Sequence, residues 1–502
     1  MNTNGSIIKK LFSQAGVYGI STVLGRILNW LLVPLYTRVL VQTSDYGIVT
    51  NLYSWFALAL VILTYGTETS FFWFINRESD PKKVYGTILT SLATTSTLFV
   101  VSAAIFLDPV SAALGYAEYK EFVMMLAVII AVDAFCSLPF AHLRHQKKAI
   151  PFAVIKMISI AINIALNLFF LLAAPWLSKN GFSAVELVWS PGNEIRYIFV
   201  SNVFSSAFTF LALSPDFLFK WSFDAKLLKR IFAYSFPILL TGIAGIFNQT
   251  ADKILFPHLF SDTTEAQSQL GIYGACFKIT VIMMMVSQAF RYAYDPFVFR
   301  YKKEGADTST LADIMTCFII CSLFVFLGVT FYLDILKYFI GSGYHSGLPI
   351  VPIVMLGEFF FGIYYNLSIW YRLTDRMIWW GTCFSFSACA ISILIIVVFV
   401  PKFGFMACAW ASFVSNLVIM VASYFFGQRY FPVPYRIKTA CFCFAIAMIL
   451  WAAAAFVPIE NKVLSLVFKT VLLAVFAVTA VWKEPLLRSG AAGIKKKLIG
   501  GK

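Results

Sequence analysis

Apolar residues gather in fourteen stretches of about 20 residues, the length that crosses the hydrocarbon core of a bilayer as one helix. These stretches run through nearly the whole chain, with polar gaps between them. The pattern therefore predicts an all-α polytopic membrane protein. The expected spans are residues 14–37, 47–73, 86–107, 121–141, 150–173, 195–213, 231–257, 270–296, 311–333, 348–371, 377–400, 404–427, 436–457 and 463–482.

Lys and Arg fall mainly in every second gap between these spans. With the N-terminus in the cytoplasm, 26 of the 39 basic residues lie in cytoplasmic segments and seven in outer ones. Because cytoplasmic loops carry the excess of Lys and Arg, both termini are predicted to be cytoplasmic. The net charge of +15 would otherwise suggest nucleic-acid binding. That class is excluded here because the basic residues form no single stripe.

The loops leave no room for a soluble catalytic domain. The longest outer gap, about residues 174–194, offers only Lys179, Glu186 and Glu194 as ionisable groups. The chain has four His and shows neither a nucleophile–base spacing nor a Gly-rich phosphate loop. All nine Cys fall inside predicted spans without a Cys-x-x-Cys pair, which is typical of packing residues rather than disulfides or metal ligands. We expect no enzyme, no cofactor and no metal site, but movement of something across the membrane.

Polar residues recur at helical spacing inside two of the spans. In the first span, Thr22, Arg26 and Asn29 share one face beside Gly25, and we expect that face to border a water-filled cavity. The alternative is that such polar residues only hold helices together. The seventh span carries a similar stripe, made of Thr241, Gly245, Asn248 and Asp252.

Two charged residues face each other across the turn between the fourth and fifth spans. Asp133 and Lys156 are expected at similar depths, where an antiparallel hairpin would set them side by side. They form either a buried structural ion pair or part of a substrate path. Lys156 also shares a helical face with Asn163 and Asn167, which favours a face that lines a cavity.

Further charges lie at membrane depth, where each costs about 2.5–3.5 kcal/mol unless a partner, a cavity or a function offsets it. Arg291 and Asp295 stand one turn apart and can neutralise each other. Lys278 has no such local partner and is the better candidate for contacting an anion. The carboxylates that can carry a coupling ion, or pair with a cation, are Glu68, Asp133, Asp252 and Glu358.

The chain contains an internal repeat. Thr22 and Asn29 correspond to Thr241 and Asn248 at an offset of 219, and Gly47-Ile48 corresponds to Gly271-Ile272 at an offset of 224. Six spans separate the copies, so both keep the same orientation in the bilayer. We therefore predict two parallel six-helix lobes around a central cleft, residues 1–213 and 214–430. An extra two-helix hairpin and a basic cytoplasmic tail follow at residues 431–502.

Several short motifs occur in a fixed order along residues 10 to 430. They are Pro34-Leu35-Tyr36-Thr37-Arg38-Val39-Leu40, Asp45-Tyr46-Gly47, Gly66-Thr67-Glu68-Thr69-Ser70-Phe71-Phe72, Leu143-Arg144, Ser235-Phe236-Pro237, Asp252-Lys253, Gly271-Ile272-Tyr273 and Asp295-Pro296-Phe297. Because these motifs occur in this order, the chain resembles the Wzx-type polysaccharide flippases of the multidrug, oligosaccharidyl-lipid and polysaccharide exporter superfamily. Many such relatives carry an Arg just after the paired Phe, where this chain has Trp73. Arg77 lies one helical turn further on, and we expect it to supply that basic contact.

The resemblance implies a flippase that moves undecaprenyl-diphosphate-linked oligosaccharide from the cytoplasmic to the periplasmic leaflet of a bacterial inner membrane. It would act by alternating access, for a surface polysaccharide such as the O-antigen of lipopolysaccharide. Its partners would be that lipid-linked glycan, the bilayer, and a polysaccharide polymerase with its assembly proteins. A large polar cargo with an anionic diphosphate needs a hydrated cleft with basic walls. The expected lining residues are Arg26, Asn29, Lys156, Asn248, Gln249, Lys278 and Arg291.

Three other functions stay open. A cation-coupled drug antiporter of the same superfamily would need a cleft dominated by carboxylates, whereas this chain has at least as many basic groups. A lipid II flippase would pair Arg with Asp in the first span, where this chain has Arg26 and Asn29. A membrane glycan polymerase would need a larger outer loop.

Overall fold

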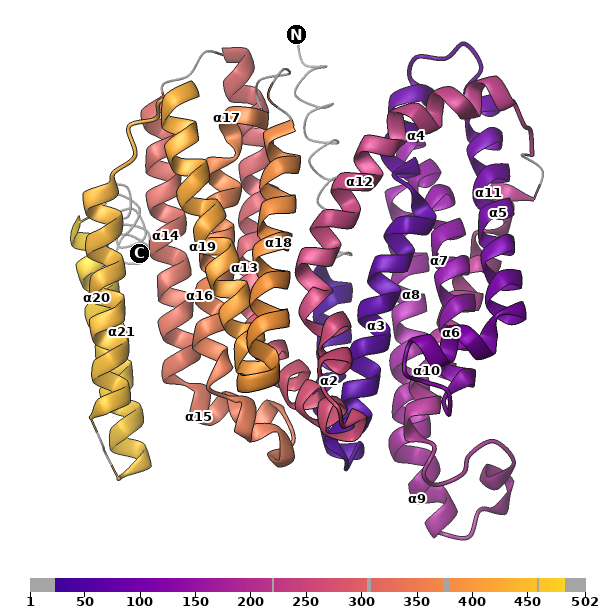
Figure 1. The fold of residues 1–502 in the computed structure, drawn as a ribbon, viewed down its shortest axis with the longest axis horizontal. Helices are drawn as coiled ribbons and strands as arrows, with labels where there is room; N and C mark the ends of the chain where they lie inside the picture. Colours follow the sequence, from indigo (N-terminus) through magenta and orange to yellow (C-terminus); the bar gives the residue numbers. More distant parts are fainter. Residues whose placement is uncertain are drawn as a thin grey trace, which may run out of the picture. The chain divides into compact units, whose positions relative to one another are not determined.

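The computed structural model of the chain describes residues 23–218, 221–304, 308–372, 377, 379–457 and 460–483. Regular structure in these residues is helical throughout (Figure 1). Thirteen helical segments in this described part are long and apolar enough to cross a membrane. The predicted all-α polytopic fold is therefore confirmed, and about fourteen spans agrees with the count. The first expected span, residues 14–37, lies partly outside the described residues.

The chain separates into two compact units, Met1–Gly271 and Ile272–Lys502. The lobe boundaries predicted from the repeat, 1–213, 214–430 and 431–502, stay predictions. The helices of the first unit are α2 (Val33–Val39), α3 (Thr43–Thr64), α4 (Thr67–Ile75), α5 (Pro81–Ile105), α6 (Leu107–Ala113), α7 (Lys120–His145), α8 (Ala149–Leu168), α9 (Ala174–Lys179), α10 (Glu194–Ala212), α11 (Ser214–Phe217) and α12 (Ala225–Leu255).

The long helix α13 (Thr263–Glu304) begins in the first unit and continues into the second. The other helices of the second unit are α14 (Thr308–Phe331), α15 (Leu333–Leu336), α16 (Ile350–Leu367), α17 (Ile369–Arg372), α18 (Trp379–Phe403), α19 (Phe405–Tyr430), α20 (Ile437–Phe456) and α21 (Lys462–Lys483). The predicted C-terminal hairpin corresponds to α20 and α21, which pack against each other and against α14 (Figure 1).

Helices α12 and α13 begin several residues before their apolar stretches, because acidic residues cap them outside the predicted spans. The Asp224 carboxylate accepts hydrogen bonds from the backbone N–H groups of Lys226 and Leu227, and Asp262 does the same for α13. Such caps satisfy N–H groups that have no partner inside the helix. Asp224 also accepts a hydrogen bond from Lys83 at 2.8 Å, which is the main reason that the pKa of Asp224 falls to about 2.

The core of the first unit lies between α4, α5, α7 and the start of α12. Phe71, Ile88, Leu92 and Leu213 are completely buried there, and Phe135 is nearly so. Ser70 of α4 and Ser235 of α12 share a buried hydrogen bond of 2.5 Å within this region. This packing fixes α4 and the C-terminal half of α7, which hold Glu68 and Arg144, two of the charged side chains described below.

The two glycines that the repeat makes equivalent lie against each other. A Cβ atom on Gly47 of α3 would overlap the carbonyl oxygen of Gln267, and one on Gly271 of α13 would overlap that of Thr43. Thr43 precedes Gly47 by four residues, as Gln267 precedes Gly271, so the offset of 224 relates both contacts. Next to the glycines, the hydroxyl groups of Thr43 and Ser268 lie 2.5 Å apart. The crossing thus has the two-fold symmetry that a repeat generates.

This crossing predicts that Gly47→Ala and Gly271→Ala destabilise the protein. The added methyl group meets backbone, which cannot move aside as a side chain can, so the expected cost is about 1–3 kcal/mol each. The measurement is the midpoint of thermal unfolding of the purified protein in detergent.

The matched control is Gly328→Ala in α14, where a Cβ atom would meet nothing within 4 Å. Alanine stabilises an open helical position by about 0.5–1 kcal/mol relative to glycine. Equal midpoints for Gly47→Ala and Gly328→Ala would contradict the proposed tight crossing.

Candidate functional site

A break in the helical backbone places Glu68. Tyr65 and Gly66 take left-handed conformations, with φ of 32° and 70°, and so end α3 and start α4. Glu68 then lies in the first turn of α4, where the helix dipole favours a carboxylate. Its Oε1 atom lies 2.8 Å from Nη2 of Arg144, which is in the last turn of α7. About half of the Glu68 side chain is exposed, so this ion pair is accessible from outside the core.

Arg144 and Lys156 share an aromatic support. The Arg144 guanidinium lies over the rings of Phe72 and Phe152, at 5.5 and 5.8 Å from their centroids. The Lys156 ammonium lies 5.3 Å from the Phe152 centroid and 5.4 Å from that of Phe140. Cation–π contacts of this kind stabilise each cation by about 0.5–1 kcal/mol, and more where water is excluded. The ring of Phe152 thus contacts two cations, Arg144 and Lys156, in one region of the first unit.

Four charged side chains act electrostatically on Lys156: Arg144, Glu68, Arg26 and Asp133. We call these five residues the charged cluster. Three of them are cations and two are carboxylates, so the cluster has a net charge of +1 when all are ionised. It can therefore attract an anion, and Glu68 then competes with that anion for Arg144.

Asp133 and Lys156 do not form a direct ion pair, which was one of the two alternatives expected for them; a role of either residue in a substrate path stays a prediction. Among the described residues, Asp133 accepts a hydrogen bond from Ser206 of α10 at 2.8 Å, and no salt bridge joins it to Lys156. Helix α7 ends at His145, so Asp133 lies about 18 Å along it from the turn, whereas Lys156 lies about 10 Å into α8. The two side chains therefore stand at different depths.

Asn163 and Asn167 do not continue a cavity lining. Both are buried, and the Asn167 amide donates to Asn163 Oδ1 at 2.7 Å while the Asn163 amide donates to Asn202 of α10 at 3.2 Å. Farther along the same interface, Ser159 and Ser205 share a hydrogen bond of 2.8 Å. These polar residues join α8 to α10. They therefore hold two helices together, which was the alternative to lining a cavity.

Arg26 and Asn29 are both exposed, on the described helical segment 23–30. Gly25 in this segment lies against Ile160, one turn beyond Lys156 on α8, and a Cβ atom there would meet the Ile160 side chain at 2.6 Å. This close approach brings Arg26 within electrostatic range of Lys156. Thr22, the third member of the predicted face, lies outside the described residues.

The polar stripe of α12 passes from the surface into the core. Thr241 and Gln249 are exposed, Asn248 is half-buried, and Asp252 is buried. The Asn248 Oδ1 atom is buried without a hydrogen-bond partner among the described residues. A hydrogen-bonding cargo could satisfy it.

Asp252 is part of a buried ion pair. The Lys253 ammonium lies 3.0 and 2.8 Å from the two oxygens of the Asp252 carboxylate, and both residues are less than 10% exposed. Asn51 of α3 donates to the Lys253 carbonyl oxygen at 2.6 Å and accepts from the Tyr116 hydroxyl at 2.9 Å. The geometry suits a structural role; an ion-coupling role for Asp252 stays a prediction.

In the second unit, Lys278 and Arg291 lie on α13 and Glu358 lies on α16, and each of them is half-buried. The Arg291 guanidinium lies over the rings of Phe361 and Tyr365, at 5.1 and 4.3 Å. Thirteen residues separate Lys278 from Arg291, which is about 20 Å along the helix. They cannot both contact one diphosphate group, so they would act on different parts of a cargo or at different stages.

Arg77 does not project toward the charged cluster. Its guanidinium lies 3.9 Å from the Trp73 centroid, and Tyr234 of α12 lies on the same indole at 4.9 Å. The basic group that accompanies Glu68 is instead Arg144, which the sequence analysis included in a motif but not among the site residues. The signal was the pair Leu143-Arg144 itself, because an Arg in the last turn of a helix is favoured by the helix dipole and is well placed for a charged contact.

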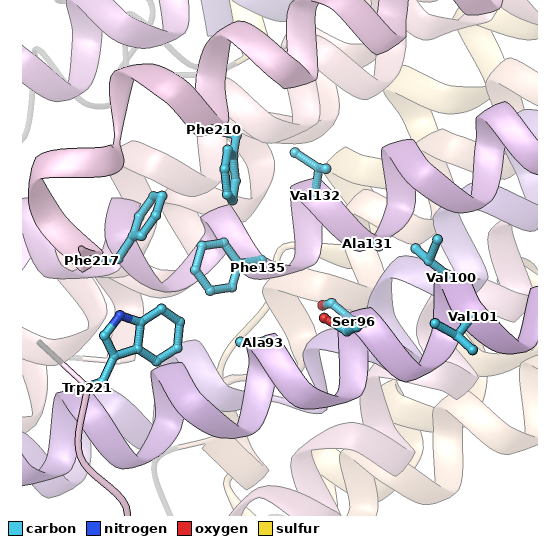
Figure 2. Close-up of a pocket in the computed structure, with 11 residues that line it drawn as sticks. Ala93, Ser96, Val100, Val101, Ala131, Val132, Phe135, Phe210, Phe217 and Trp221 are labelled. Carbon is cyan, nitrogen blue, oxygen red and sulfur yellow. The ribbon is translucent and has the colours of Figure 1, made fainter. Parts of the chain in front are cut away.

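An apolar hollow of about 360 Å³ lies elsewhere in the first unit, between α5, α7 and α10 (Figure 2). Phe135, Phe210, Phe217 and Trp221 form its aromatic end, and Ser96 lies among its other lining residues. Nothing in the hollow is charged. In the part of the chain that is described, no three His, Cys, Asp or Glu side chains gather as metal ligands. The charged cluster is therefore the stronger candidate for binding a polar cargo.

Comparison with known proteins gives the chain a sequence family and shows which solved structures have a similar fold. A family model described as "Polysaccharide biosynthesis protein" matches residues 11–300. None of the curated proteins is similar enough to match. The solved structure "Lipid II flippase MurJ, inward closed conformation" has a TM-score of 0.70 and 14% identity, over 93% of this chain and 99% of that chain.

Transporters of the multidrug resistance MATE family of the MOP superfamily are also similar. An inward-facing structure has a TM-score of 0.60 and 12% identity, over 83% of this chain and 97% of that chain. An outward-facing structure has a TM-score of 0.56 and 12% identity, over 84% and 95% respectively. At these identities the likeness shows the fold alone.

The Asp252–Lys253 geometry predicts that Asp252→Asn is strongly destabilising. Lys253 would keep its charge inside the protein without that carboxylate, at an expected cost of about 3 kcal/mol or more. Replacing both residues, as Asp252→Asn with Lys253→Met, should recover most of the loss. Thermal unfolding in detergent measures the difference.

Asp334→Asn is the control, since Asp334 accepts from Lys469 at 2.9 Å at an exposed site, and exposed pairs contribute less than about 1 kcal/mol. If Asp252→Asn unfolds at the same temperature as Asp334→Asn, the buried pair does not stabilise the fold.

Proposed function

The chain belongs to the polysaccharide biosynthesis protein family, and from this membership we propose that it is a flippase for undecaprenyl-diphosphate-linked oligosaccharide. It is a multi-pass membrane protein with the fold shared by flippases and transporters of the MOP superfamily. The proposed direction is from the cytoplasmic to the periplasmic leaflet of a bacterial inner membrane, with both termini cytoplasmic. The glycan would then pass to a polymerase and its assembly proteins.

The charged cluster is the observation that carries this proposal. Arg26, Arg144 and Lys156 supply three cations where Glu68 is the accessible carboxylate. A diphosphate binds best to several Lys and Arg donors, because charge-assisted hydrogen bonds to phosphate are about twice as strong as neutral ones. Glu68 would hold Arg144 until a phosphate replaces it. The exchange keeps the guanidinium paired at every stage and so avoids the cost of a bare charge at the membrane.

The glycan needs hydrogen bonds rather than charge. Asn29 and Gln249 are exposed, and Asn248 has a buried carbonyl oxygen without a partner, so all three amides can bond sugar hydroxyls. The cargo lipid would stay in the bilayer while the polar part crosses. No bond is made or broken in this cycle, and alternating access of the cleft would accomplish the transfer.

A cation-coupled drug antiporter is the main alternative, since MATE transporters share the fold. It would be supported if Glu68→Gln abolished resistance to cationic drugs and left glycan export unchanged. A lipid II flippase is the second alternative, because the structure of the lipid II flippase MurJ has a higher TM-score, 0.70, than the inward-facing MATE transporter, 0.60. In that case loss of the protein would block peptidoglycan synthesis rather than a dispensable surface polysaccharide.

The first test locates the lipid-linked oligosaccharide in cells that lack the protein. Its glycan is labelled from the periplasmic side, with and without permeabilising the inner membrane. The expected result is intermediate that is labelled only after permeabilisation, because it is trapped in the cytoplasmic leaflet. Repeat units that reach the periplasm but remain unpolymerised would instead identify a polymerase.

The second test removes cluster charges one at a time. Arg26→Ala, Arg144→Ala and Lys156→Ala should each reduce glycan export about tenfold or more, since each charged hydrogen bond contributes about 1.5–3 kcal/mol. The variants should remain inserted and abundant. Lys179→Ala, at an exposed position outside the cluster, is the matched control and should export normally. Normal export in all three cluster variants would remove the proposed cationic site.

A further inference from the structure

The second unit contains an apolar slot of about 460 Å³ between α14, α16, α19 and α20. Ile319, Phe360, Phe425 and Phe444 each contribute from a different one of these helices, with Ala440 as a small residue on α20. Val421 and Phe425 are 41% and 66% exposed, so one side of the slot opens toward the surrounding bilayer. Figure 1 shows the four helices side by side in this unit.

The slot extends through most of the depth of one membrane leaflet. It extends along α16 from Phe359 to Leu367, about 12 Å at 1.5 Å per residue, and along α20 from Ile437 to Phe444, about 10 Å. The hydrocarbon core of a bilayer is about 30 Å thick. An apolar chain that lies in the slot would therefore reach from one membrane surface through most of one leaflet.

Basic residues surround the mouth of the slot. Arg436 lines it directly, while Arg429 and Lys438 are exposed on the neighbouring turns of α19 and α20. Among the described residues, the carboxylate that an ion pair places at this mouth is Asp313 of α14, whose Oδ1 atom lies 2.6 Å from Arg436. Three cations against one carboxylate leave a net positive charge at the membrane surface. Basic pockets between spanning helices favour anionic lipid headgroups over zwitterionic ones.

We propose that this slot binds one anionic phospholipid, with an acyl chain between the four helices and the headgroup at Arg436, Arg429 and Lys438. A lipid chain next to a void of this size enters it, because the side chains that line an empty void lose van der Waals contacts. The cargo lipid fits less well, since an undecaprenyl chain is far longer than one leaflet is deep. The bound chain would join α20, the first helix of the C-terminal hairpin, to α16 and α19. This inference does not depend on the proposed cargo.

The test uses full-length protein purified in detergent, stripped of lipid and studied by native mass spectrometry. Phosphatidylglycerol and phosphatidylcholine with identical chains are added separately. The expected result is one retained phosphatidylglycerol per chain, bound more tightly than phosphatidylcholine. Each basic group near an anionic lipid contributes a factor of about five, so Arg436→Gln should lower this preference about fivefold.

Ala440→Phe tests the chain-binding part by filling the slot, and it should abolish retention of phosphatidylglycerol. Ile449→Phe on the same helix is the matched control, because Ile449 is 66% exposed and does not line the slot. Equal retention by the two variants would overturn the proposal.

Wild-type protein provides a measurement that does not depend on the folding of any variant. Phosphatidylglycerol with a photoreactive diazirine near the end of its acyl chain should crosslink to lining residues of α16, α19 and α20. Crosslinks spread evenly over the lipid-facing helices would overturn the proposal. Displacement of phosphatidylglycerol by an equal concentration of undecaprenyl phosphate would assign the slot to the cargo lipid instead.

Discussion

The cost of placing a charge or an unpaired backbone group in hydrocarbon decides most of this structure. Backbone N–H and C=O groups have no water to bond in a bilayer, so each crossing segment must be a helix that satisfies its own hydrogen bonds. Charged side chains obey the same rule with a higher penalty. The charges whose partners are known accordingly lie against a carboxylate, a cation, a hydroxyl or an aromatic ring; they are Glu68, Asp133, Arg144, Lys156, Asp252, Lys253 and Arg291.

The protein meets this constraint in two different ways. Asp252 and Lys253 are neighbours in the chain and almost completely buried, so their mutual contact is permanent and serves the fold. Glu68 and Arg144 come from different helices and remain partly exposed, so their contact can be exchanged for another. Lys156 uses the rings of Phe140 and Phe152, which leave the ammonium able to attract an anion. A transport site needs the second kind of solution, in which charges are stabilised but not fully satisfied.

The symmetric glycine crossing adds a geometric constraint to the electrostatic one. Helices α3 and α13 approach closely because neither Gly47 nor Gly271 has a Cβ atom, and each glycine lies beneath the turn that precedes its counterpart. The same pair of positions had been matched by the internal repeat. A duplicated sequence that meets its own copy must use a self-complementary contact, and glycine is the simplest residue that provides one.

The sequence by itself determined the helical fold, the approximate ends of the spans and the repeat, because these depend on the local run of apolar residues and on spacing along one chain. It also singled out Arg26, Glu68, Asp133 and Lys156, four of the five residues of the charged cluster. Only the tertiary structure decided which groups meet: it paired Glu68 with Arg144, gave Asp133 a hydrogen bond from Ser206 rather than a direct pair with Lys156, and buried Asn163 and Asn167 between helices. Such partners depend on helix depth and rotation, which differ by several ångströms with small changes in where each helix begins. Hydrophobic periodicity does not fix those quantities, because any rotation that keeps an apolar face toward lipid satisfies it equally well.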